Sequence, residues 1–274
     1  MNGDFEVLNN LKIGIVGCGH LGQAIAQMLV RGGLEKTNLL ISYGGNPLTY
    51  QKLKEQGLDI CLAENQKVFE KAGIVLITVR PQDITGLKAS LVTGRALIVS
   101  CMAGVPLELI QRILGANVYR MMFSGPDTIV SGKGVAAMYP EHEHLKLMLN
   151  MLNLLQIKTA TESDMDIFTV GVCMTAALLK AENTVETKNA VEKIKDQYPL
   201  FSELYAWAVT ALPDIQSETE REIYVSRMIT KGGVTDAVIK SLANGETFDA
   251  ALIKGINRTK EISAEIRQQL ENSL

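Results

Sequence analysis

The stretch Leu11–Gly22 reads LKIGIVGCGHLG, an apolar run that ends in three glycines. The run predicts a β-strand, and the residues after Gly22 repeat apolar side chains with the 3.6-residue period of a helix. A strand, a tight turn and a helix in this order form a phosphate site, in which Gly17 permits the turn, Gly19 admits a pyrophosphate and Gly22 lets the helix approach the strand. The pattern predicts dinucleotide binding, and a purely structural glycine turn is the alternative.

Length and composition predict a globular protein with a large core. The chain has 274 residues, which predicts two domains or one enlarged α/β domain. Hydrophobic residues make up 47% and charged residues 21% of it, and no apolar run approaches the ~18 residues of a membrane span. The N-terminal segment MNGDFEVLNN lacks the pattern of a signal peptide. We therefore expect no membrane insertion and a cytoplasmic location.

Charge and cysteine usage favour a small-molecule partner. The net charge of −3 is spread without long like-charge blocks, so nucleic acid is not an expected partner. The 4 cysteines lie far apart in the chain, which fits reduced thiols better than a disulfide framework or a zinc site. His142 and His144 are two residues apart and do not share a helical face, so we expect no metal.

The end of the second predicted strand, Asn38–Ser42, bears on the choice of cofactor. A carboxylate that reads the ribose of NAD is expected about twenty residues past the glycines. Ser42, Tyr43 and Gly44 occupy this turn instead, and an uncharged loop leaves room for a 2′-phosphate. We therefore expect NADP rather than NAD, although no Arg or Lys follows directly to pair the phosphate. An ordinary Gly-Asn-Pro turn is the alternative.

Two further apolar runs, Ile74–Val79 and Ala96–Ser100, predict buried strands of a parallel sheet. Asn117–Met122 and Gly134–Met138 predict two more. Ligands of such sheets lie outside the carboxyl ends of the strands, so the turns after the two apolar runs should face the nicotinamide. The predicted cofactor contacts are Gly17, Cys18, Gly19, His20, Leu21, Gly22, Ser42, Tyr43, Gly44, Val79, Arg80, Pro81, Gln82 and Ala103.

The pattern changes to helices from Ser163 onwards. We expect one long helix from Asp164 to about Lys195, followed by shorter helices starting at Leu200, Glu218, Thr235 and Thr247. The long helix carries more apolar surface than a lone helix exposes to water, and such a surface usually packs against another subunit. The predicted fold is an α/β Rossmann domain over residues 1–160 and an all-α dimerisation domain over residues 161–274.

Together these landmarks resemble the pyrroline-5-carboxylate reductase family from about Lys12 to about Leu252. The motifs that carry the resemblance are GCGHLG at Gly17–Gly22, VRPQ at Val79–Gln82, SCMAG at Ser100–Gly104, Arg120 with Pro126, and KGGVT at Lys231–Thr235. The resemblance implies an N-terminal Rossmann domain, a C-terminal helical domain that forms a homodimer, and NAD(P)H-dependent reduction of a cyclic imine to proline.

The substrate motifs of the family are altered in this chain. R-x-M-P-N-T-P is replaced by Arg120–Pro126 (RMMFSGP), S-G-S-G-P-A-Y by Val170–Ala176 (VGVCMTA), and S-P-G-G-T-T by Thr230–Thr235 (TKGGVT). Replacement of two serines by Val170 and Val172 removes hydroxyl groups from a place where the family positions substrate.

The loop Thr230–Thr235 is the predicted acceptor site. Gly232, Gly233 and Val234 are the expected substrate contacts, because glycines can turn N–H groups towards a carboxylate and a helix begins near Thr235. Lys231 adds a cation if it points inwards. Thr235 matches the family threonine that hydrogen-bonds the imine nitrogen or its proton-donating water, and it can also simply cap the helix.

Three functions remain open at this point. The first is an NADPH-dependent reductase of a cyclic imine, in proline synthesis or on a related imino acid. The second is a noncatalytic NADP-binding sensor or structural protein. The third is a reductase of a different acceptor, such as a deazaflavin, in the same superfamily.

Overall fold

The computed structural model describes residues 7–272, except residues 9, 88–95, 116–117 and 182–183. It contains a 7-stranded sheet in the order β2-β1-β3-β4-β5-β6-β7. Strands β1 to β5 run parallel, β6 pairs antiparallel with β5, and β7 pairs parallel with β6. The strands are β1 Ile13–Val16, β2 Leu39–Ser42, β3 Ile74–Ile77, β4 Leu97–Ser100, β5 Val118–Phe123, β6 Val135–Tyr139 and β7 Leu155–Gln156.

The central strands are apolar because helices cover both of their faces. All four residues of β1 and of β3 are buried. On one face lie α2 (His20–Arg31), α6 (Pro126–Val130) and α7 (Glu143–Met151), whose side chains form one core cluster with the sheet. On the other face lie α4 (Asn65–Lys71) and α5 (Leu107–Leu114), whose cluster continues into the helical part of the chain.

The remaining elements of the first part connect the strands. The helix α3 spans Pro47–Glu55, and three short 3-10 helices span Lys36–Asn38 (η1), Asp59–Cys61 (η2) and Pro81–Gly86 (η3). The strand predicted over Ile74–Val79 ends at Ile77. Thr78 turns away there and uses its hydroxyl to bond the Gly17 carbonyl oxygen at 3.0 Å. Asn117, the predicted start of another strand, lies outside the described residues.

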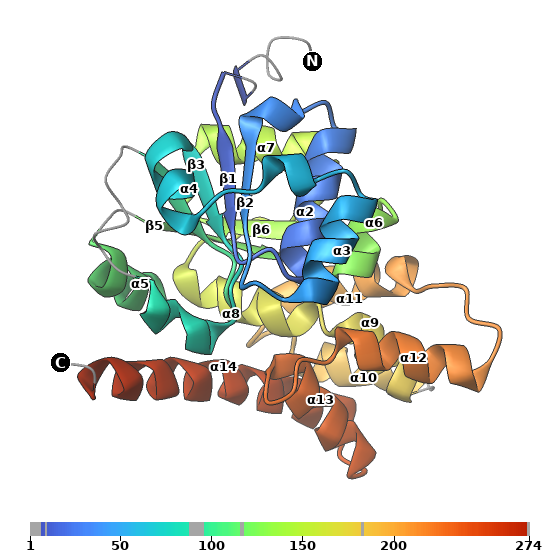
Figure 1. Ribbon diagram of the computed structural model, residues 1–274. Helices are drawn as coiled ribbons and strands as arrows, with labels where there is room; N and C mark the ends of the chain where they lie inside the picture. Colours follow the sequence, from blue (N-terminus) through green and yellow to red (C-terminus); the bar gives the residue numbers. More distant parts are fainter. Residues whose placement is uncertain (1–6, 9, 88–95, 116–117, 182–183, 273–274) are drawn as a thin grey trace.

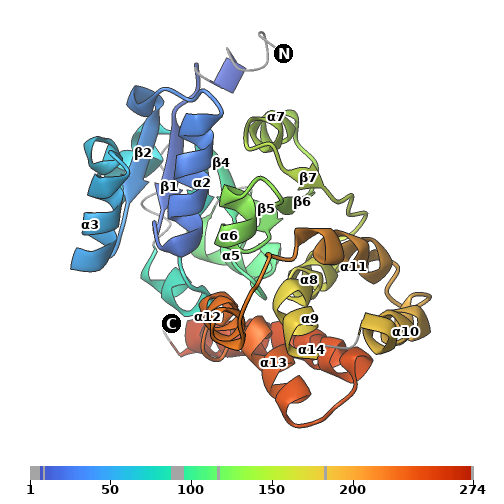
Figure 2. The same cartoon turned by 90° about the vertical axis from the view of Figure 1, so that its right-hand side faces the viewer.

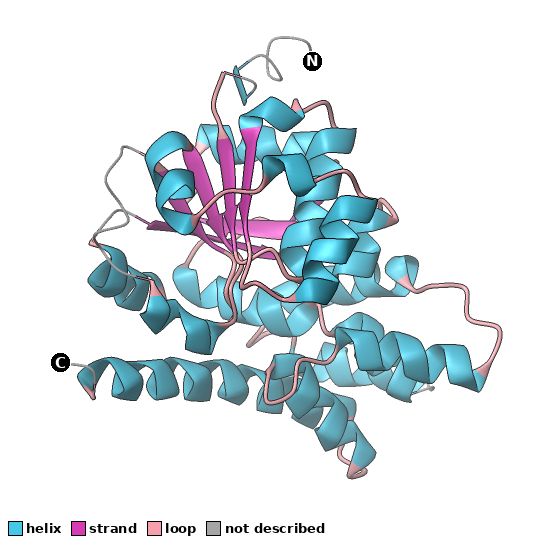
Figure 3. Ribbon diagram, viewed as in Figure 1, coloured by secondary structure: helices cyan, strands magenta, loops and turns pink. Residues whose placement is uncertain are grey.

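From Glu162 onwards the regular elements in the described part of the chain are all helices, which lie below the sheet (Figure 3). The helices are α8 Glu162–Gly171, α9 Met174–Ala181, α10 Thr184–Ile194, α11 Leu200–Ala211, α12 Glu218–Met228, α13 Val234–Ala243 and α14 Phe248–Glu271. The long C-terminal helix α14 runs beneath the sheet and packs against α8, α10 and α13 (Figure 1). The α/β fold followed by a helical part confirms the predicted fold class.

The single helix expected from Asp164 to Lys195 is wrong. The chain turns at Val172 and Cys173, between α8 and α9, and a further helix begins at Thr184. Three residues with poor helix propensity, Val170, Gly171 and Val172, lie at the end of α8 and in this turn. Gly171 also lets α11 approach closely, since a Cβ atom there would lie 2.3 Å from Leu204 Cδ1.

The apolar face of this segment is covered by the chain itself. Val170, Cys173, Met174 and Ala177 are buried and belong to one core cluster with α11, α13 and α14. The argument that this face requires another subunit therefore fails. The last strand ends at Gln156 and α8 begins at Glu162, so we retain a domain boundary near residue 160 as a proposal. No helix in the described part of the chain combines the length and the apolar character that crossing a membrane requires.

Candidate cofactor and acceptor site

The glycine turn after β1 is held against the ends of two neighbouring strands. Gly17 has a φ of 89°, a conformation that L-residues with a side chain rarely adopt. Its N–H and that of Cys18 both donate to the Ser42 carbonyl oxygen, at 3.1 and 2.9 Å. A Cβ atom on Gly17 would lie 2.4 Å from Val79 Cγ1. The turn therefore needs glycine at this position for conformation and for space.

The other two glycines of the motif have different surroundings. A Cβ atom on Gly22 would lie 2.8 Å from Thr78 Oγ1 and 3.1 Å from Ile15 Cγ2, so this glycine brings α2 close to the sheet. Gly19 is exposed, and a Cβ atom there would meet nothing closer than the Gly17 carbonyl oxygen at 3.9 Å. Space beside Gly19 is thus left for a ligand, as pyrophosphate binding requires.

The N-terminus of α2 fits an anion. Gly19 is its N-cap residue and supplies no side-chain acceptor. The N–H groups of His20, Leu21 and Gly22 have no acceptor among the residues that the structure describes. These donors and the positive end of the helix are the features that bind a phosphate group.

A cleft of about 450 Å³ brings most of the predicted cofactor residues together. It joins the glycine turn to the turns that follow β2 and β3, as expected for the carboxyl edge of a parallel sheet. The hydroxyl oxygen of Ser42 is buried in its wall without a hydrogen-bond partner among the described residues. From the predicted set, the cleft is lined by Gly17, Cys18, Gly19, Ser42, Tyr43, Gly44, Val79 and Arg80.

Several lining residues were not predicted. Thr78 could have been identified from the sequence, because it is the polar residue that follows the apolar run of β3. Thr49 of α3 and Asn65 of α4 could not, since only the fold brings them to the cleft. Asp83 also lies there and pairs with Arg80 at 2.8 Å, so the Arg80 guanidinium already has a carboxylate partner.

The rest of the predicted cofactor set is not among the residues that line the cleft. Leu21 and Gly22 belong to α2, and His20 lines two neighbouring hollows. Pro81 and Gln82 begin η3, while Ala103 is half-buried in the turn after β4. That turn contacts α14, because a Cβ atom on Gly104 would lie 2.9 Å from the Thr259 carbonyl oxygen.

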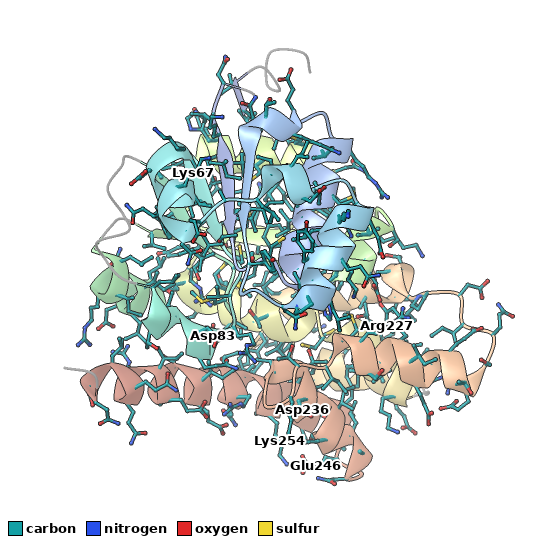
Figure 4. The ribbon with its side chains drawn as sticks, viewed as in Figure 1. Lys67, Asp83, Arg227, Asp236, Glu246 and Lys254 are labelled. Carbon is teal, nitrogen blue, oxygen red and sulfur yellow. The ribbon has the colours of Figure 1, made fainter. Side chains whose placement is uncertain are left out.

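The helical part reaches the carboxyl edge of the sheet through α12. Met228 packs on the turn after β5, where a Cβ atom on Gly125 would lie 2.3 Å from Met228 Cε. Figure 2 shows α9, α12, α13 and α14 gathered below the sheet. The loop from Thr230 follows α12 directly, and Asp236 lies just beyond it, below Asp83 in Figure 4.

The glycine N–H groups of this loop are not free to bind a carboxylate, contrary to the prediction. Gly232 N–H donates to Asp236 Oδ2 at 2.8 Å, and Gly233 N–H donates to the Thr230 carbonyl oxygen at 2.8 Å. The Lys240 ammonium and the Gly232 N–H hold the pKa of Asp236 below its usual range. The protein's own carboxylate therefore occupies the position that was assigned to a substrate carboxylate.

Thr235 contacts the segment Val170–Ala176, one of the altered family motifs. Its Oγ1 lies 3.2 Å from Cys173 Sγ, in the turn between α8 and α9. Burial raises the pKa of the Cys173 thiol to about 11, and the bond to Thr235 acts in the opposite direction. Val170 is buried in the core, where it packs against Gly255 of α14. Val234 is buried as well, whereas Lys231 is exposed.

Arg120, the arginine of the family motif, joins the sheet to the helical part. Its side chain is only 1% exposed and pairs with Glu162 at 3.3 Å and with Asp166 at 3.2 Å. Glu162 also accepts the Leu107 N–H at 2.7 Å. Burial raises the pKa of Asp166, against the effect of Arg120. The arginine is therefore a structural connection between β5 and α8.

Comparison with known proteins agrees with this arrangement. Residues 12–104 match the sequence model of a family described as NADP oxidoreductase coenzyme F420-dependent. Pyrroline-5-carboxylate reductase from Aquifex aeolicus is 26% identical over 132 residues, which are 48% of this chain and 48% of that protein. Pyrroline-5-carboxylate reductase 2 from Dictyostelium discoideum is 32% identical over 118 residues, 42% of this chain and 39% of that protein.

Solved structures extend the likeness of fold to nearly the whole chain. Plasmodium falciparum pyrroline carboxylate reductase with NADP bound aligns with a TM-score of 0.58 and 16% identity over 93% of this chain and 99% of that one. The enzyme from Coxiella burnetii aligns with a TM-score of 0.58 and 21% identity over 92% and 98%. The chain therefore resembles the pyrroline-5-carboxylate reductases in fold over nearly its whole length and in sequence over part of it. In sequence it spans about half the length, or less, of the curated relatives quoted above.

Proposed function

We propose that the protein is an NADPH-dependent reductase of a cyclic imine, either pyrroline-5-carboxylate or a related imino acid. The observation that carries the proposal is the cleft at the carboxyl edge of the sheet, which joins Gly17–Gly19 to Ser42–Gly44 and Val79. A relative with the same fold is described with NADP bound. The helical part covers the same edge and supplies Thr235.

The residues of this chain have three tasks in such a reaction. A bound nicotinamide supplies the hydride, so the protein must hold the cofactor, orient the imine and exclude water. The N-terminus of α2 and the glycine turn would hold the pyrophosphate, and Ser42, whose hydroxyl has no hydrogen-bond partner among the described residues, would contact the ribose. Thr235 is the hydroxyl that can orient the imine nitrogen or a water beside it.

Two alternatives are favoured by particular observations. A noncatalytic NADP-binding protein is consistent with Gly232 and Gly233, whose N–H groups are committed within the loop. A reductase of another acceptor is consistent with Val170 and Val172, which replace serines of the family motif and are buried. Measurement of NADPH consumption against a panel of cyclic imines, with and without a carboxylate, separates the three. Oxidation of NADPH by carboxylated five-membered imines supports the proposal, and binding of NADPH without turnover supports the first alternative.

We also propose that the protein is a homodimer through its helical part. Apolar side chains remain exposed on four of these helices, namely Val185 on α10, Val209 on α11, Ile223 on α12 and Ile253 on α14. The helix α12 has no fully buried residue in the single chain. Helices of this kind usually pack against a partner. Light scattering at micromolar concentration tests the proposal, and a monomer would contradict it.

A further inference from the structure

The N-cap residue of α3 and two residues of the helix lie on one side of it, beside the cofactor cleft. Asn46, Thr49 and Lys52 are spaced three residues apart, a spacing that places side chains on the same side of a helix. All three line a hollow of about 320 Å³ that also contains His20 of α2. Thr49 lines both this hollow and the cofactor cleft, so the two are adjacent.

The cleft side of this junction fits a phosphorylated ribose. Ser42 and Gly44 line the cleft where β2 ends, and no carboxylate stands at that turn to read a free 2′-hydroxyl. The Ser42 hydroxyl is buried, at 4% residue exposure, and has no hydrogen-bond partner among the described residues. A buried polar group without a partner is costly, and a ligand hydroxyl or phosphate oxygen would satisfy it.

The N-terminus of α3 cannot bind the phosphate by itself. The Asn46 side chain already accepts the N–H groups of Leu48 at 2.9 Å and of Thr49 at 3.2 Å. Side-chain donors must therefore supply the contacts, and a dianionic group favours a cation. Lys52 stands one turn beyond Thr49, is exposed, and has no ion pair within the part of the chain that the structure describes. The nearby carboxylate of Glu55 accepts the Gln51 amide at 3.0 Å.

We propose that Lys52, with the Thr49 hydroxyl, recognises the 2′-phosphate of NADP(H) and sets the preference for this cofactor. The inference rests on the proposed function, because it assumes a dinucleotide in the cleft. Lys52 would supply the cation for the phosphate, since no Arg or Lys directly follows β2 in the sequence. A flexible four-carbon side chain lets the Lys52 ammonium reach over Thr49 to the ribose at Ser42–Gly44.

Two nucleotide fragments and a matched lysine pair test the proposal. Adenosine 2′,5′-bisphosphate and 5′-AMP differ in the 2′-phosphate, and their binding to the full-length protein is measured by calorimetry. Lys52→Gln should weaken binding of the bisphosphate about tenfold, or about 1.4 kcal/mol, and leave 5′-AMP within about twofold. Lys54→Gln, on another face of α3, should change neither. Thr49→Val should give a smaller loss for the bisphosphate alone, about threefold.

The outcomes distinguish this inference from the proposed function. Equal effects of Lys52→Gln on both fragments, or no effect on either, would overturn the role of Lys52 while leaving dinucleotide binding intact. An equal loss of bisphosphate binding in Lys54→Gln would show a general charge effect and would also overturn it. If the wild-type protein binds neither the fragments nor NADPH, the proposed function fails and the inference fails with it.

Discussion

Thr235 Oγ1 and Cys173 Sγ lie 3.2 Å apart and link the start of α13 to the turn between α8 and α9. Both residues belong to segments that match substrate motifs of the family, so the fold brings together two motifs that are about sixty residues apart in the sequence. This contact uses one of the hydrogen-bonding sites of the Thr235 hydroxyl, either its proton or a lone pair. A substrate that needs the same site must compete with Cys173.

Replacement of the Thr235 hydroxyl tests whether it acts on the acceptor. Thr235→Val retains the shape of the side chain, and we expect turnover to fall about tenfold to a hundredfold with NADPH affinity unchanged. Thr235→Ser should retain most of the activity. Steady-state kinetics and calorimetric titration of NADPH provide the two readouts. A Thr235→Val protein with wild-type turnover would show that the hydroxyl serves only the structure of α13.

Two glycines of the turn should respond to valine in opposite ways. Gly19→Val should fold normally, since its side chain meets open space, and should weaken NADPH binding at least about a hundredfold by blocking the pyrophosphate. Gly17→Val should lower stability by more than about 3 kcal/mol, because of the positive φ and the contact with Val79. Thermal unfolding and NADPH titration of both variants check this contrast. Unchanged NADPH affinity in a folded Gly19→Val protein would refute the assignment of the turn.

The sequence predicts the parts of the site that depend on local structure. The apolar runs and the glycine spacing identify β1, β3, β4 and the turn after β1, since a strand buried on both faces and a tight turn each have a local pattern. The break at Val172–Cys173 was missed, because a pattern of apolar residues with helical period continues across it. The close packing of Gly171 against Leu204 at the end of α8 is a contact between distant segments, which this pattern does not show.

Contacts between distant segments were not predictable in this way. Thr49 and Asn65 belong to separate helices, α3 and α4, and nothing in the local sequence indicates that both line the cofactor cleft. The carboxylate of Asp236 is a further example. It lies four residues after Gly232 and accepts that residue's N–H, whereas a glycine-rich loop alone suggested a vacant anion site.

The four cysteines should be unreactive in the folded protein. All four are buried and unpaired, and burial raises the pKa of Cys18 to about 12 and that of Cys173 to about 11. At pH 8 about one Cys173 thiol in a thousand is then ionised, and the thiolate is the reactive form. Ellman's reagent should detect four thiols after unfolding in urea and none at a comparable rate before it. A rapidly reacting thiol in the native protein would contradict the burial of these side chains.

Asp166 should make part of the stability depend on pH. Its pKa in the folded chain is raised by burial above the unfolded value of 3.8, with Arg120 opposing the shift. Between these two pKa values the folded state binds more protons than the unfolded state, so the free energy of unfolding falls as pH rises through the interval. Asp166→Asn removes this titration and leaves an oxygen that can accept from Arg120. Urea unfolding between pH 4 and pH 7 should therefore show a smaller decline in the free energy of unfolding for the variant. The difference should be about 1 kcal/mol or less, because the carboxylate is partly exposed.

The exposed Asp196→Asn serves as the control and should follow the wild-type curve. Parallel curves for Asp166→Asn and the wild type would show that Asp166 titrates alike in the folded and unfolded chains.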